Sequence, residues 1–252
     1  MRIALLSDIH GNAIALEAVL ASIAREGGAD EYWILGDVVA LGPDPVGVME
    51  HLALLPGLRM IRGNTDRYVV SGDRPSPTLD EARQDPKLLP SLVEVANTFA
   101  WTQGMVTAAG WLERLKVLPL ELRLTLPDGT RFLGVHASPQ RDDGTGVYPG
   151  IKDNELEALF DGCDDSLVCM GHTHLPFEHR WKGIHLVNPG AVSLSLTPDR
   201  DAYYAILEAT RDGYSVNHRQ VSYDHQLVVD QLVHVSHPGR AFLIKHLSSP
   251  NQ

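Results

Sequence analysis

Five short apolar runs in this chain each stop at a turn that carries Asp, Asn or His. The runs are Ile3–Leu6, Tyr32–Leu35, Leu58–Ile61, Phe132–Val135 and Leu167–Met170. A short apolar run bounded by turn signals predicts a buried β-strand. Residues just past the carboxyl ends of such strands converge on one crevice in an open α/β sheet. We therefore expect the polar side chains that follow the five runs to form one site.

Seven side chains with oxygen or nitrogen donors follow these runs. They are Asp8, His10, Asp37, Asn64, His136, His172 and His174. Each is a weak signal alone, because an Asp after a strand most often caps a helix and Gly-Asp and Gly-Asn are common turn dipeptides. The ordered set is improbable by chance. In His172-Thr173-His174 the spacing lets both imidazoles leave an extended segment on the same side, so each can reach a metal ion.

Composition narrows the class of protein. The chain has 252 residues, of which 44% are hydrophobic and 21% charged, which is enough for one large domain over residues 1–252. The net charge of −11 argues against a broad surface for nucleic-acid backbone. Bound divalent cations would still allow a phosphorylated substrate, because they dominate the local field of a cleft.

Cysteine usage and hydropathy suggest a compartment. Cys163 and Cys169 are the only cysteines, and Cys169 falls inside a predicted buried strand, so we expect no disulfide and a reducing cytoplasm. The first apolar stretch has only four residues before Ser7, which is too short for a signal peptide. No window approaches 18 uninterrupted apolar residues, so no membrane span is expected.

The first third of the sequence predicts alternating strands and helices. Helices are expected over Ala13–Arg25, capped by Asn12, and over Pro45–Leu54. The second half predicts more antiparallel pairing. Its expected elements are a hairpin of Leu120–Leu126 with Arg131–Val135, a helix Asp153–Phe160, a strand Ile184–Val187, and a hairpin of Ala202–Glu208 with Tyr214–Val221.

Residues 71–116 differ in composition from the segments before them. Prolines at positions 75, 77, 86 and 90 indicate an exposed excursion, and Leu92–Leu115 follows with a helical pattern. We expect Gly104 and Gly110 to split this pattern into two helices. Our interpretation is an inserted helical cap near the cleft; the alternative is a lateral surface element without a substrate role.

The pattern resembles the calcineurin-like metallophosphoesterase superfamily, and more closely its small bacterial and archaeal branch. The resemblance extends from Asp8 to about Ser193. It includes Asn188-Pro189-Gly190, Gly42-Pro43-Asp44-Pro45 and His136-Ala137-Ser138-Pro139. The resemblance implies an α/β fold, a four-layer α/β/β/α sandwich of two mixed sheets, with metals at the strand ends.

The resemblance also implies a two-metal site. Asp37 would bridge the ions, because a two-oxygen anion can bind both while lowering their repulsion. Asp8, His10 and His174 would complete the first site, and Asn64, His136 and His172 the second. This mixture of imidazoles and carboxylates suits Mn, Fe, Zn, Ni or Co better than Ca or Mg.

One position departs from the family pattern. The usual Gly-Asn-His-Asp reads Gly63-Asn64-Thr65-Asp66 here. In the family this His sits beside the substrate and protonates the leaving group or steadies the phosphate; Thr65 is too weak an acid to replace it. We take Asp37, Asn64, Thr65 and Asp66 as the candidate catalytic residues. Arg62 is a candidate phosphate ligand or a surface ion-pair partner.

The expected function is metal-dependent hydrolysis of phosphomonoesters or phosphodiesters by in-line attack of a hydroxide that bridges two divalent ions. The alternative is a non-catalytic metal-binding scaffold of the same fold. A phosphorylated small molecule, a nucleotide or a phosphoprotein would each fit as substrate, and the oligomeric state stays open. Of the remaining histidines only His185, which precedes the Asn188 turn, is a candidate to approach the site.

Overall fold

The computed structural model describes residues 1–248, and its first sheet has the strand order β10-β9-β1-β2-β3. The strands are β1 (Arg2–Leu6), β2 (Glu31–Ile34), β3 (Leu58–Met60), β9 (Ala202–Thr210) and β10 (Gly213–Val221). Strands β1, β2 and β3 run parallel, whereas β9 pairs antiparallel with both β1 and β10. This mixed sheet contains the first three predicted strands.

The second sheet has the order β4-β5-β6-β8-β7. Its strands are β4 (Glu121–Thr125), β5 (Arg131–Val135), β6 (Leu167–Cys169), β7 (Phe177–Trp181) and β8 (Ile184–Asn188). The parallel strands β5, β6 and β8 lie in the middle, and the antiparallel strands β4 and β7 form the edges. The sequence did not predict β7, because three successive side chains in this strand are exposed.

An apolar core joins the two sheets face to face. Trp33 of β2 stacks on Phe132 of β5 with 4.4 Å between the ring centroids, and both side chains are fully buried. A Cβ at Gly134 would lie 3.0 Å from the Trp33 ring. The glycine that interrupts the fourth apolar run therefore makes room for this tryptophan.

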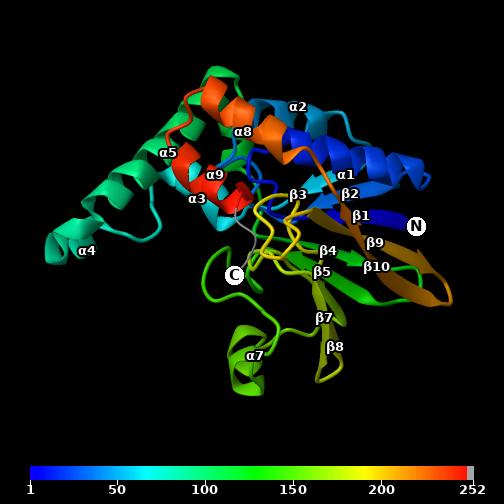
Figure 1. Cartoon of the computed structure of the whole chain (residues 1–252). Helices are drawn as coiled ribbons and strands as arrows, with labels where there is room; N and C mark the ends of the chain where they lie inside the picture. The colour runs from blue at the N-terminus through cyan, green and yellow to red at the C-terminus, as the bar shows by residue number, and fades with distance from the viewer. Residues whose placement is uncertain (249–252) are drawn as a thin grey trace.

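Helices cover the outer faces of both sheets (Figure 1). They include α1 (Ala13–Arg25), α2 (Pro45–Ala53), α3 (Asn64–Ser71), α7 (Asp153–Leu159), α8 (His225–His234) and α9 (Arg240–Ser248). Asn12 caps α1 as expected, accepting a hydrogen bond from the Ala15 amide at 3.0 Å. The predicted four-layer α/β/β/α arrangement of two mixed sheets is confirmed.

The segment after α3 contains α4 (Leu79–Gln84), a 3-10 helix (Pro86–Leu88), α5 (Leu89–Ala108) and α6 (Leu112–Lys116). The expected break at Gly110 is present, and Gly110 has a φ of 81°. The expected break at Gly104 was wrong, because α5 continues through it. The neighbouring side chains hold the helix there: Gln103 donates to the Val69 carbonyl at 2.7 Å, and Thr102 and Val106 are buried.

Figure 1 shows α4 and the start of α5 projecting away from the two sheets. The far end of α5 packs against α2 and α3, which anchors the projecting arm. Within residues 1–248, no helix combines the length and the apolar character needed to cross a membrane.

Candidate metal centre

All seven candidate ligands lie together at the carboxyl ends of strands from both sheets. The first sheet contributes Asp8 and His10 after β1, Asp37 after β2, and Asn64 after β3. The second sheet contributes His136 after β5 and the His172/His174 pair after β6. The centre therefore lies where the two sheets meet, and its seven residues come from five separate segments of the chain.

The first cluster of donor atoms consists of Asp8, His10 and His174. Their donor atoms all lie within 4.8 Å of one another. The Nε2 atoms of His10 and His174 are 3.1 Å apart, and Asp8 Oδ1 lies 3.4 Å from His174 Nε2. Three donors at this spacing can surround one cation.

The second cluster consists of Asp8, Asp37 and His136, again with all donor atoms within 4.8 Å. Asp37 Oδ1 lies 3.4 Å from His136 Nε2, and Asp37 Oδ2 lies 3.7 Å from His10 Nε2. Asp8 belongs to both clusters, which the sequence pattern did not indicate. The two clusters therefore share Asp8. Asp37 also lies close to both, because its two oxygens face His136 of the second cluster and His10 of the first.

Asn64 and His172 extend the second cluster. The Asn64 side-chain oxygen lies 3.1 Å from His136 Nε2 and 3.2 Å from His172 Nδ1. The backbone amide of His172 donates to Asp8 Oδ2 at 3.0 Å. Asn64, which follows a strand of the first sheet, thus contacts two histidines that follow strands of the second sheet.

Backbone carbonyls fix how three of the imidazoles face the centre. His136 Nδ1 lies 2.7 Å from the Leu35 oxygen, and His174 Nδ1 lies 2.8 Å from the Leu194 oxygen. His172 Nε2 lies 2.8 Å from the Gly144 oxygen. Since a carbonyl only accepts, each of these nitrogens carries a proton, and the opposite nitrogen of a neutral ring is free to bind a metal. His172 therefore presents Nδ1, whereas His136 and His174 present Nε2.

The backbone at the centre is strained. Five of the seven residues have positive φ: Asp8 (54°), His10 (49°), Asp37 (55°), His172 (70°) and His174 (58°). A residue with a Cβ pays of order 1–3 kcal/mol for such a conformation, and strain of this kind clusters at functional sites. Gly63 avoids a collision here, since a Cβ on it would lie 2.1 Å from Asp37 Oδ1.

Charges at the centre are strongly coupled. Burial pushes the pKa of Asp37 upward, but His136 and the Thr65 amide outweigh burial and hold this pKa well below its usual value. Burial lowers the pKa of His10 to about 4. Burial also lowers the pKa of His136, but the negative charge of Asp37 dominates and raises it to about 10. The centre is therefore a buried, ionised set of carboxylates that favours cations.

The other two predicted catalytic residues are placed differently. The Asp66 carboxylate accepts from the backbone amides of Val38 at 2.9 Å and Gly63 at 3.0 Å, so it holds the two loops that carry Asp37 and Asn64. Burial and the nearby Asp37 raise the pKa of Asp66 to about 7. Thr65 is 7% exposed, its amide donates to Asp37 Oδ1 at 2.9 Å, and its hydroxyl has no hydrogen-bond partner among the described residues.

The hydrogen bonds of the Arg62 and His185 side chains are made to residues outside the seven candidate ligands. Arg62 Nε donates to Asp142 at 2.8 Å, which fits the ion-pair interpretation. His185 Nε2 lies 2.8 Å from Glu178, and its Nδ1 lies 3.1 Å from the Tyr214 hydroxyl. His185 is thus a structural residue of the second sheet.

The sequence pattern did not single out the loop of residues 142–144. Arg67 binds Asp142 and Asp143, and Tyr68 donates to Asp143 at 2.5 Å. The adjacent Gly144 carbonyl accepts from His172. The spacing of these acidic residues gave no signal, because their partners lie on α3, some 75 residues earlier in the chain.

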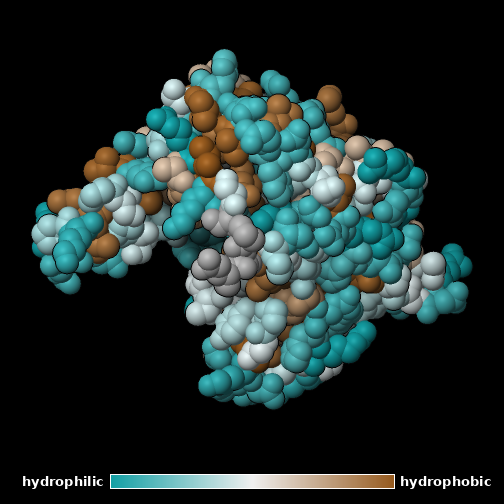
Figure 2. Space-filling model, in the orientation of Figure 1, coloured by the Kyte–Doolittle hydropathy of each residue, from teal (hydrophilic) through white to brown (hydrophobic). Residues whose placement is uncertain are grey.

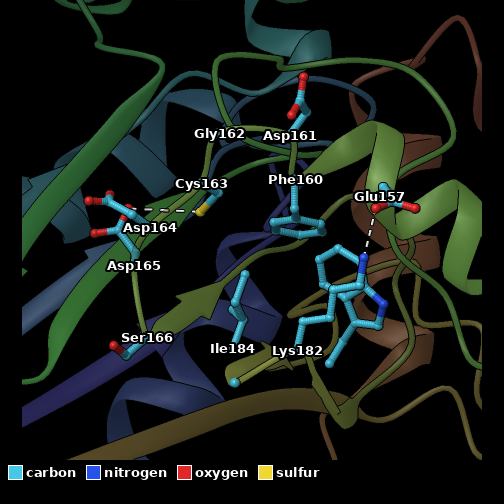
Figure 3. Close-up of a pocket in the computed structure, with 12 residues that line it drawn as sticks. Glu157, Phe160, Asp161, Gly162, Cys163, Asp164, Asp165, Ser166, Lys182 and Ile184 are labelled. Atoms are coloured by element: carbon cyan, nitrogen blue, oxygen red, sulfur yellow. Dashed lines mark hydrogen bonds and ion pairs between the residues drawn. The ribbon is translucent and has the colours of Figure 1, made fainter.

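A cavity of about 370 Å³ lies away from the centre, between the end of α7 and the turn after β7 (Figure 3). Glu157 pairs with Lys182 at 2.7 Å across it, and Cys163 lies 3.9 Å from Asp165. None of the seven candidate ligands lines this cavity. Among the described residues, the two groups of His, Cys, Asp and Glu side chains whose donor atoms could hold a metal ion both lie at the candidate centre and not in this cavity.

The chain is similar in sequence and in fold to several known proteins. An uncharacterized protein of Methanocaldococcus jannaschii is 29% identical over 204 residues, which cover 81% of this chain and 73% of that protein. A metallophosphoesterase from Sphaerobacter thermophilus has a similar structure with a TM-score of 0.75 and 27% identity, covering 100% of this chain and 99% of the other.

A shorter match is to a protein whose name states a hydrolytic activity. The symmetrical bis(5'-nucleosyl)-tetraphosphatase of Serratia proteamaculans is 35% identical over 68 residues. That match covers 27% of this chain and 24% of the enzyme, so it spans about a quarter of the relative's length. The family model of the calcineurin-like phosphoesterase superfamily domain matches residues 1–212. The chain therefore belongs to the calcineurin-like phosphoesterase superfamily.

Proposed function

We propose that this protein hydrolyses phosphomonoesters or phosphodiesters with two divalent metal ions held by Asp8, His10, Asp37, Asn64, His136, His172 and His174. The donor set fits such ions, because it combines buried carboxylates, an amide oxygen and imidazoles whose free nitrogens converge. Two bound ions would polarise the phosphoryl group and supply a hydroxide for in-line attack. No nucleophilic side chain of the protein is required.

One observation carries the proposal. The two carboxylate oxygens of Asp37 face different imidazoles, with Oδ1 3.4 Å from His136 Nε2 and Oδ2 3.7 Å from His10 Nε2. A carboxylate placed this way can give one oxygen to each of two cations. The Thr65 amide, which donates to Oδ1 at 2.9 Å, holds the carboxylate in this orientation.

The membership of the family supports hydrolysis of a phosphoester, and the substrate class is open among small phosphorylated molecules, nucleotides and phosphoproteins. The relative from Serratia proteamaculans adds a dinucleoside tetraphosphate to the compounds worth testing. Thr65 favours a second candidate function, a metal-binding scaffold without catalysis, because it supplies no general acid.

Metal analysis and a substrate panel test the proposal together. The purified protein should contain close to two metal ions per chain after loading with Mn, Ni, Co or Zn. It should then hydrolyse members of a panel of phosphomonoesters, phosphodiesters and dinucleoside polyphosphates. Bound metal without hydrolysis of any of these compounds would favour the scaffold instead.

Asp37→Ala should abolish hydrolysis and loosen both ions, whereas His174→Ala should weaken mainly one of them. Asp165→Ala is the matched control, because Asp165 is also a buried Asp but pairs with Arg123 outside the centre. Inductively coupled plasma analysis after dialysis gives the metal content of each variant. Full activity in Asp37→Ala would show that the measured hydrolysis belongs to a contaminant.

A further inference from the structure

A cavity of about 350 Å³ opens directly beside the candidate metal centre. Asn64 and Thr65 form one end of it, and Asn64 is also a member of the centre through its contacts with His136 and His172. A phosphoryl group bound at the centre would therefore place its organic substituent at the mouth of this cavity.

The walls of the cavity are mostly apolar and partly aromatic, although Ser91, Glu94 and Thr98 also line it. They include Leu41, Tyr68, Val95, Phe99, Phe242 and Leu243. The rings of Tyr68 and Phe99 meet edge to face, with centroids 5.6 Å apart and planes at 90°. The Tyr68 hydroxyl is engaged with Asp143, so this ring is held in place.

Two elements that do not contribute metal ligands build most of these walls. Val95 and Phe99 come from α5, and Phe242 and Leu243 come from α9. Phe242 is 59% exposed, although it is a large apolar side chain next to a reactive centre. Figure 2 shows the surface hollowed between the projecting arm of α4 and α5 and the rest of the molecule. Because Phe242 lines an apolar cavity and is exposed, its ring is accessible to a ligand that enters the cavity.

Thr65 supplies a polar group where the cavity adjoins the metal centre. Its side chain is buried, it lines the cavity, and its hydroxyl has no hydrogen-bond partner among the described residues. Buried polar groups are normally paired, so an unpaired hydroxyl in a ligand-sized cavity calls for a partner. An oxygen or nitrogen atom near the phosphoester bond of a substrate would provide one.

We propose that this cavity binds a flat aromatic group of the phosphoester, either an aryl ring or a nucleobase. The inference rests on the proposed function and names its substrate class. Aromatic rings fit because edge-to-face contacts with Tyr68, Phe99 and Phe242 favour them over aliphatic groups of equal size. In this arrangement α5 and α9 select the substrate, and the strand-end loops perform the chemistry.

Binding of non-hydrolysable phosphonates to the metal-loaded protein tests the inference without relying on turnover. Isothermal titration calorimetry would compare methylphosphonate, cyclohexylmethylphosphonate, naphthylmethylphosphonate and the phosphonate analogue of adenosine monophosphate. The naphthylmethyl compound should bind about tenfold or more tightly than methylphosphonate, given what one apolar group contributes in a pocket. It should also bind more tightly than the cyclohexylmethyl compound. The adenosine analogue shows whether a nucleobase or a simple aryl group fits better.

Val95→Trp should fill the cavity and reduce the preference for the naphthylmethyl group over methylphosphonate to about twofold or less. Val93→Trp is the matched control, because Val93 lies two positions away on α5, is 54% exposed and does not line the cavity. Phe242→Ala removes a wall at an exposed position and should also weaken binding of the naphthylmethyl compound, so the test does not depend on one variant folding.

The outcomes separate the two proposals. Failure of every phosphonate to bind would contradict the proposed function and, with it, this inference. Binding of methylphosphonate and naphthylmethylphosphonate with equal affinity would overturn the aromatic cavity alone. An undiminished preference in both Val95→Trp and Phe242→Ala would overturn it as well.

Discussion

Thr65 is the residue at which this centre differs most from the pattern it resembles. Its hydroxyl is buried and lines the aromatic cavity, but it cannot donate a proton to a departing alkoxide. Asp66 does not compensate, because its carboxylate is occupied by the amides of Val38 and Gly63. Among the candidate catalytic residues the centre thus offers no free acid to the leaving group.

The rate of hydrolysis should therefore depend steeply on the pKa of the leaving group. Aryl esters, whose leaving groups are stabilised anions, should be cleaved far faster than alkyl monoesters. Thr65→His should selectively raise the rate for alkyl substrates, by up to about 10²-fold, since general acids contribute about 10²–10⁴-fold. Plots of log kcat/KM against leaving-group pKa for both proteins check this. Similar rates for alkyl and aryl esters in the natural protein would mean that another acid acts.

Residues can be predicted from this sequence better than their roles. The strand-end pattern predicted that the seven candidate ligands would lie together, because each follows an apolar run that is visible in the sequence. It could not show that Asp8 joins both donor clusters, or that Asp66 binds backbone amides. Those facts depend on distances between loops of different strands, which the order of residues does not contain.

At the scale of helices and strands, predictions from the local sequence were wrong where contacts with other parts of the fold determine the structure. Gly104 suggested a helix break, yet packing by Thr102 and Val106 carries α5 through it. Helix α3 begins at Asn64. The sequence pattern predicts a candidate metal ligand there, and the start of a helix at the same residue was not predicted. Helices α8 and α9 were not predicted, although Asp224 caps α8 by accepting from the Leu227 amide.

Gly104→Ala should increase the free energy of unfolding by about 0.5–1 kcal/mol, because alanine has the higher helix propensity. A Cβ at Gly104 meets no atom within 4 Å, so the substitution introduces no clash. Gly110→Ala is the contrasting control: its Cβ also meets nothing, but its φ of 81° disfavours any side chain. Urea denaturation measures both. A stabilising effect of Gly110→Ala would contradict the assignment of the helix end.

The turn between α8 and α9 should make the protein sensitive to acid. Burial, aided by Arg240, lowers the pKa of His237 from 6.5 to about 4. Between these values the unfolded chain binds a proton that the folded protein does not, so stability falls as the pH drops from 6.5 to 4. His237 Nδ1 accepts from the Gly239 amide at 3.1 Å, and Trp101 of α5 contacts the ring.

His237→Asn keeps an acceptor for that amide and removes the titration. The variant should lose less stability than the natural protein between pH 7 and pH 5, with a difference of up to about 2 kcal/mol. Urea denaturation at both pH values, in the presence of a chelator, gives the comparison. Parallel losses in the two proteins would show that His237 does not contribute.

At the scale of the whole molecule, the candidate centre connects two sheets that are otherwise joined by an apolar interface. Bound metal should therefore stabilise the entire fold. A ligand at 100 times its dissociation constant contributes about 2.7 kcal/mol, so Mn should raise the melting temperature and a chelator should reverse the shift. Differential scanning calorimetry of the natural protein, Asp37→Ala and Asp165→Ala measures this. The shift should vanish only in Asp37→Ala, and an equal shift in all three proteins would place the stabilising metal elsewhere.

The division of the centre between two sheets also constrains how such a protein can change over evolutionary time. Four of the donors follow strands of one sheet and three follow strands of the other. Asp8 and His172, which lie side by side at the centre, are separated by 164 positions in the chain. Exchange of either sheet by recombination would discard part of the donor set and, with it, every metal-dependent property at once. Most of the walls of the aromatic cavity lie outside both sheets, on α5 and α9. Lineages can therefore replace those helices and explore new substrates while they inherit the reactive centre intact.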